Sequence, residues 1–106
     1  MTLIRNSILN NLRLEFGTQY TFELKTTYSS LASYLDYCFS HVQVNDSWRA
    51  YIEYQPGYNG RDEGLHATHR YVDDDGRYYV CWTAPIKSYQ DSQTIAEKWA
   101  SLTDQY

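Results

Sequence analysis

The feature that most constrains this fold is a pair of extended segments joined by an Asp-Gly turn. Residues 65–72 and 77–84 flank Asp73-Asp74-Asp75-Gly76, and an Asp-Gly pair tolerates the positive φ angles that tight hairpin turns need. Upstream, apolar and polar side chains alternate strictly over residues 48–54, as expected for a strand with one buried face. We therefore predict an antiparallel meander of three strands over residues 48–84.

Helical periodicity dominates the segments on either side of the meander. Apolar side chains recur every four positions over residues 3–13 and every three or four positions over residues 27–42, which is the strongest helical pattern in the chain. A last helix begins at a cap formed by Ser88 or Asp91, and it places Ile95, Ala96, Trp99 and Leu102 on one side. Each pattern predicts an amphipathic helix with one stripe to bury.

Residues 14–25 leave two alternatives open. Apolar and polar residues alternate there, which predicts a fourth strand, but a loop that joins two helices fits nearly as well. The predicted fold class is therefore α+β, with a three-stranded or four-stranded antiparallel meander packed on one face by two or three helices. The length of 106 residues and the absence of repeats or linkers predict a single domain over residues 1–106.

The predicted order of helix, three-strand meander and helix over residues 27–104 resembles that of a double-stranded-RNA-binding domain. The last helix of that family begins with lysines aimed at phosphate. Here the corresponding residues 88–93 contain an acid and no lysine. The resemblance therefore implies topology without function. Because the net charge is −4 and the basic residues are scattered, we expect no nucleic acid among the partners.

Polar residues interrupt residues 1–6 every few positions, so we expect neither a signal peptide nor a membrane-spanning stretch at the N-terminus. We therefore expect a soluble cytoplasmic protein without membrane contact. Cys38 and Cys81 are the two cysteines, and a pair of isolated cysteines is more typical of buried thiols than of a disulfide framework.

His66 and His69 are the residues most suggestive of metal or acid-base chemistry. On a strand, residues three positions apart point to opposite faces, so these two side chains would not share a metal ion, and we predict no metal and no cofactor. Either histidine, with Glu53 on the neighbouring strand, could form a polar site in a cleft against the glycine-rich loop 57–64. This is the alternative hypothesis: a small enzyme or ligand-binding protein.

The leading hypothesis rests on the tyrosines, of which the chain has 12. Several lie on the predicted meander, and one of its faces is expected to present an outward aromatic pair flanked by arginines. Tyrosine and arginine are enriched in binding hot spots. We predict a non-catalytic protein-interaction or assembly module, whose partner is another protein or a second copy in a homodimer, with interface residues Arg49, Tyr51, Arg70, Arg77 and Tyr79.

Overall fold

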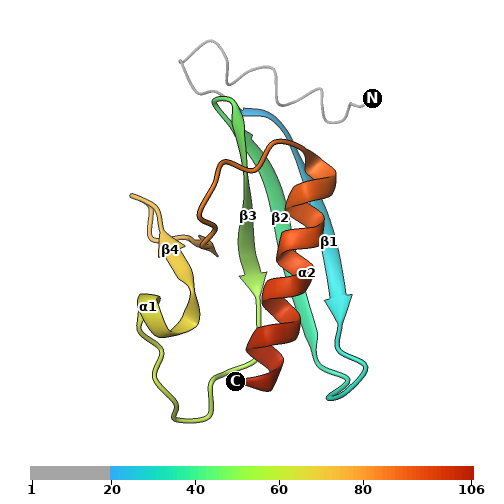
Figure 1. Cartoon of the computed structure of the whole chain (residues 1–106), viewed down its shortest axis with the longest axis vertical. Coiled ribbons are helices and arrows are strands. Elements are labelled where there is room, and N and C mark those ends of the chain that lie inside the picture. Colours follow the sequence, from blue (N-terminus) through green and yellow to red (C-terminus); the bar gives the residue numbers. More distant parts are fainter. Residues whose placement is uncertain (1–19) are drawn as a thin grey trace.

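A computed structural model of the chain describes residues 20–106. This part is an α+β fold, an antiparallel sheet of five strands with one long helix packed on it and one short helix (Figure 1). The elements in chain order are β1 (Tyr20–Ser29), β2 (Asp36–Val44), β3 (Ser47–Tyr54), α1 (Leu65–Thr68), β4 (Arg70–Val72), β5 (Tyr78–Val80) and α2 (Tyr89–Gln105). Neither helix in this part of the chain is long and apolar enough to span a bilayer.

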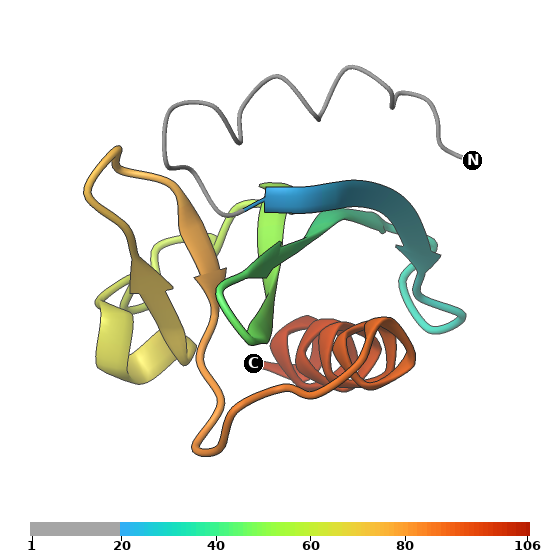
Figure 2. The same cartoon turned by 90° about the horizontal axis from the view of Figure 1, so that it is seen from above.

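The predicted C-terminal helix is confirmed as α2, and it lies along one face of β1, β2 and β3 (Figure 2). The side chain of Ser88 caps it by accepting a hydrogen bond from the backbone N–H of Asp91. Rings from the sheet and the helix form the core between them, where Phe39 and Trp99 meet edge to face with their centroids 6.0 Å apart. Burial of this apolar layer stabilises the contact of helix and sheet.

The helix predicted over residues 27–42 is wrong, because these residues belong to the hairpin of β1 and β2. Tyr37, Phe39 and His41 alternate toward α2 and are buried, whereas the helical pattern would have buried Leu31 and Tyr34, which are almost fully exposed. Aromatic residues at this spacing satisfy both periods, and the strand period prevails because one face of β2 meets α2. The resemblance to a double-stranded-RNA-binding domain loses its first helix with this correction.

Turn chemistry ends β1 at the tip of this hairpin. The Ser30 side chain accepts hydrogen bonds from the backbone N–H groups of Ala32 and Ser33, and Tyr34 has the left-handed φ of 62°. The next turn contains Asn45, whose φ of 58° suits the short connection between β2 and β3. These two turns produce a meander of β1, β2 and β3, which begins earlier in the chain than the meander predicted over residues 48–84.

The predicted meander over residues 48–84 is correct in part. The strand over 48–54 is confirmed as β3, and the turn at Asp73–Gly76 is confirmed, with Gly76 at φ 81°. However, residues 65–68 form α1, and the left-handed His69, φ 53°, separates it from β4. The predicted strand over 77–84 ends at Val80.

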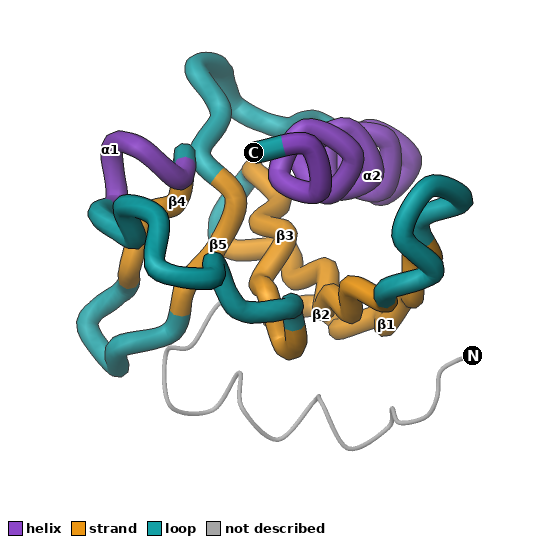
Figure 3. The backbone as a smooth tube through the Cα atoms, turned by 90° about the horizontal axis from the view of Figure 1, so that it is seen from below, coloured by secondary structure: helices purple, strands orange, loops and turns teal. Residues whose placement is uncertain are grey.

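The strand order is β1-β2-β3-β5-β4, so β3 pairs with β5 and β4 lies at the edge beside α1 (Figure 3). The predicted order of neighbours was therefore wrong at β4. Of the described helices, α2 alone packs along the sheet face, in place of the two or three predicted. The helix predicted over 3–13 and the start of segment 14–25 lie outside the described residues, and from Tyr20 onward that segment is strand.

Candidate functional site

Four of the five predicted interface residues come together on the sheet face opposite α2. Tyr51 of β3 pairs with Tyr79 of β5 in register, and their rings lie 5.4 Å apart between centroids. The Arg49 guanidinium lies 4.5 Å over the Tyr79 ring, and that of Arg77 lies 4.1 Å over the Tyr51 ring. We call these four residues the Arg–Tyr cluster. Tyr51 was predicted to be exposed on this face, and that prediction is wrong, because its neighbours cover it to 2% exposure.

Hydrogen bonds within the chain engage Tyr51, Arg49 and Arg77 of the Arg–Tyr cluster. Arg49 Nη1 donates to the Tyr51 hydroxyl at 2.9 Å, and that hydroxyl donates to Asp73 Oδ2 at 2.9 Å. Burial raises the pKa of Tyr51, and the backbone N–H of Arg77 lowers the pKa of the Asp73 carboxyl. Glu53, predicted to serve a histidine, instead pairs with Arg77 at 2.9 Å.

Arg70, the fifth predicted interface residue, lies apart from the Arg–Tyr cluster. It is buried on the α2 side of the sheet, with its guanidinium 4.1 Å over the Tyr78 ring. Its Nε donates to Thr68 Oγ1 at 2.9 Å and its Nη2 donates to the Glu63 carbonyl at 3.0 Å. Arg70 therefore anchors α1 and the preceding loop.

His66 and His69 do not lie on a strand as predicted, but on α1 and at its C-cap, and both are exposed. No acid or hydroxyl of the described residues hydrogen-bonds the His69 ring. Within residues 20–106, no group of three or more His, Cys, Asp or Glu side chains could hold a metal ion. Cys38 and Cys81 are free thiols and only half-buried.

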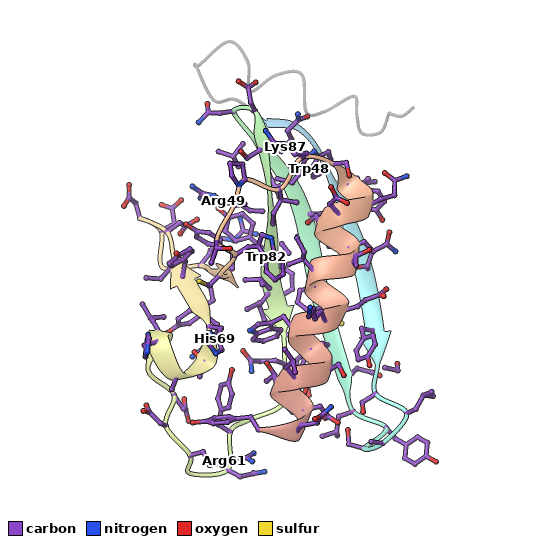
Figure 4. The ribbon with its side chains drawn as sticks, viewed as in Figure 1. Trp48, Arg49, Arg61, His69, Trp82 and Lys87 are labelled. Atoms are coloured by element: carbon purple, nitrogen blue, oxygen red, sulfur yellow. The ribbon has the colours of Figure 1, made fainter. Side chains whose placement is uncertain are left out.

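The structure contains a groove that the sequence did not predict. It lies between the C-terminal half of α2 and the segment of α1 and β5, has a volume of about 490 Å³, and is mostly apolar. Figure 4 shows Trp82 and His69 on the side of α2 that faces α1. We call this site the α2 groove, defined by His69, Trp82, Lys98, Trp99, Leu102 and Tyr106.

Three hydrogen bonds hold the walls of the α2 groove in place. The buried Trp99 Nε1 donates to the Thr68 carbonyl at 2.9 Å and so joins α2 to α1. The backbone N–H of Cys81 donates to the His69 carbonyl at 2.9 Å. The Tyr106 hydroxyl donates to the Asp62 carbonyl at 3.1 Å. Because these bonds fix both walls, the groove is a formed feature of the fold.

Large apolar side chains at the edge of the α2 groove are open to solvent. Trp82 is 40% exposed and Leu102 is 59% exposed. Deeper in the lining, Tyr58 is 5% exposed, and its hydroxyl is the buried side-chain polar atom of the described residues that has no hydrogen-bond partner. Exposed apolar side chains that line a groove can mark a binding site.

Two signals for the groove were present in the sequence but were assigned to the core. Leu102 ends the apolar stripe of the last helix, and Trp82 was placed on a strand face with Val80. Because β5 ends at Val80, Trp82 leaves the sheet and meets the helix stripe beyond its buried part. No family model, curated protein or solved structure matches this chain. The site is therefore interpreted from its own geometry.

Proposed function

We propose that this protein is a non-catalytic protein-interaction module that binds an apolar segment of a partner protein in the α2 groove. The observation that supports it is the convergence of Trp82 and Leu102 on a fixed apolar groove of about 490 Å³. Tryptophan on a rigid, concave surface is the usual anchor of a binding hot spot. A polypeptide segment that lays apolar side chains into the groove would cover both residues.

A protein partner fits this groove better than a small molecule does. Pockets for small molecules are concave enough to bury most of the surface of the ligand. Here Leu102 is more than half exposed and Trp82 nearly so, and a partner must cover an area wider than the hollow itself. Catalysis has less support, because no described acid or hydroxyl is hydrogen-bonded to His69.

The Arg–Tyr cluster is the second candidate surface. Tyr71, with its ring centroid 5.5 Å from that of Tyr79, extends the aromatic row to the sheet edge and is exposed. This edge offers an aromatic contact flanked by Arg49, as the predicted interface required. It ranks below the α2 groove because Tyr51 at its centre is already covered.

A displayed library of random 12-residue peptides tests the proposal, with selection against the wild-type chain and against a Trp82→Ala/Leu102→Ser variant. We expect wild-type selection to enrich peptides with at least two bulky apolar residues, and the variant to bind them at least tenfold more weakly. Amide shifts on addition of a selected peptide should map to α2 and α1. The control is Tyr34→Ala, which removes an exposed ring at the β1–β2 turn.

Two results would decide against the α2 groove. Selected peptides that bind the variant as well as the wild type, or that shift amides around Arg49 and Tyr71, would place binding elsewhere. Light scattering after size-exclusion chromatography measures whether the protein self-associates. A dimer that dissociates in the Trp82→Ala/Leu102→Ser variant would identify a second copy as the occupant, while a dimer unaffected by that change would exclude it.

A further inference from the structure

We infer that the partner segment carries a carboxylate beside its apolar side chains, and that Lys98 and His69 bind this group at the edge of the α2 groove. The inference rests on the proposed function and adds the charge that the groove selects. Lys98 and His69 are the basic side chains of the lining, and no Asp or Glu lines the groove. The chain as a whole has a net charge of −4. The charge of the groove lining is therefore opposite in sign to the net charge of the chain.

The position of Lys98 on α2 directs its charge to the groove. Lys98 lies three positions after Ile95 and four before Leu102, so all three residues share one side of the helix. Its aliphatic stem can lie along the apolar wall while the ammonium group stays at the edge. Glu97 leaves the helix about 100° away and is not part of the lining. Among residues 20–106, Lys98 forms no ion pair.

Two further groups that can donate hydrogen bonds to an anion lie near this edge. His69 forms the opposite wall, at the cap of α1. The Arg61 guanidinium lies 5.3 Å over the ring of Tyr106, at the end of the groove. A carboxylate among these groups would lie beside an apolar wall, where charges attract more strongly than in bulk water. Burial of apolar side chains would supply most of the affinity, and the basic edge would supply selection for an acidic partner.

A pair of dyes with the same rings tests the charge preference directly. 8-Anilino-1-naphthalenesulfonate is an anion, and N-phenyl-1-naphthylamine has the same aromatic body without the charge. Fluorescence titration gives Kd for both dyes, and the ratio of the two values isolates the contribution of the charge. In Lys98→Gln we expect the anionic dye to bind about fivefold more weakly and the neutral dye to bind unchanged, as for an exposed ion pair. Lys98→Arg should restore the wild-type ratio.

The controls separate this inference from the proposed function. Trp82→Ala should weaken both dyes, because it removes apolar wall rather than charge. If Trp82→Ala weakens both dyes while Lys98→Gln leaves their ratio unchanged, the groove binds and the inference of a carboxylate is wrong. If Trp82→Ala affects neither dye, the proposed function itself loses its support. In the wild type, 0.5 M NaCl should weaken the anionic dye alone, by screening the ion pair.

Discussion

The Arg–Tyr cluster and the α2 groove are built from similar residues and differ in how completely the chain satisfies them. In the cluster, Tyr51 is covered and hydrogen-bonded to both Arg49 and Asp73. In the groove, Trp82 is open to solvent and Tyr58 has a buried hydroxyl without a partner in the described chain. Aromatic and cationic composition alone therefore does not identify a binding surface. The exposure of apolar side chains and the presence of buried polar groups without hydrogen-bond partners identify such a surface better.

The difference has a structural cause. Strand pairing places Tyr79 in register with Tyr51 and with Tyr71, so the cluster residues face one another across neighbouring strands. The groove forms where the chain leaves the sheet after Val80 and the outer flank of α2 meets α1 instead of a strand. Strand pairing therefore packs the rings of the Arg–Tyr cluster against one another. Where strand pairing ends, Trp82 of the α2 groove stays exposed.

The largest expected effect tests whether the cluster is a structural element. Tyr51→Ala should lower the free energy of unfolding by about 3–5 kcal/mol, because it removes a buried ring and leaves Arg49 and Asp73 without their shared partner. Denaturant unfolding followed by circular dichroism measures the change. Tyr54→Ala on the same strand is the matched control, since Tyr54 is exposed and should cost less than about 1 kcal/mol. Equal losses would mean that the cluster is an ordinary surface.

The second effect compares the buried His41 with the exposed His69 of the α2 groove. His41 is fully buried between β2 and α2, with Nδ1 2.7 Å from Ser92 Oγ and Nε2 2.8 Å from Thr26 Oγ1. Burial lowers the pKa of His41 to about 4. An unfolded histidine takes up a proton near pH 6.5, so the unfolded state gains protons first as the pH falls. Stability should be complete above about pH 6.5 and should decrease below it.

Between pH 7.5 and pH 5, the difference between the folded and unfolded pKa values of His41 predicts a loss of about 2 kcal/mol in the free energy of unfolding. Denaturant unfolding at several pH values measures the loss, and this window lies above the range in which Asp73 and Asp104, whose pKa values are lowered, would contribute. His41→Gln should abolish most of the slope, and His69→Gln, at an exposed position in the groove, is the control. An NMR titration in which the His41 ring protonates near pH 6.5 in the folded state would refute the prediction.

The sequence predicted the parts of the fold that local chemistry determines. The alternation over 48–54 and the Asp-Gly turn appear as predicted, and Ser88 is the cap of the two that were predicted, Ser88 or Asp91. The hairpin of β1 and β2 was missed because Tyr37, Phe39 and their neighbours fit a helical stripe as well as a strand. Tertiary packing against α2 decides between these periods, and this packing is not visible in a window of a few residues.

The candidate site was less predictable than the fold. Tyr51 and Tyr79 were placed together correctly, but their burial depends on Arg49 and Arg77 folding over them. Arg70 was placed on the wrong side of the sheet, because it pairs with Val80 and so lies on the face of Val80 rather than on that of Tyr79. The α2 groove joins Trp82 to residues of a helix about 20 positions further on, and no local pattern contains that proximity.

The smallest expected effect comes from removing the hydroxyl group of one of two buried tyrosines, Tyr37 or Tyr58. The Tyr37 hydroxyl donates to Asp104 Oδ1 at 3.2 Å, and the Tyr58 hydroxyl has no partner in the described chain. Tyr37→Phe should therefore lower the free energy of unfolding by about 1 kcal/mol, because a carboxylate loses a donor. Tyr58→Phe should leave it unchanged within about 0.5 kcal/mol or raise it, since the mutation removes a buried polar group that gains nothing in the free protein. Each ring stays in place, so the denaturant midpoints measure the contribution of the hydroxyl group alone. An equal loss of stability in Tyr58→Phe and Tyr37→Phe would show that the Tyr58 hydroxyl already has a hydrogen-bond partner. The polar groups of the groove would then be as well satisfied as those of the Arg–Tyr cluster.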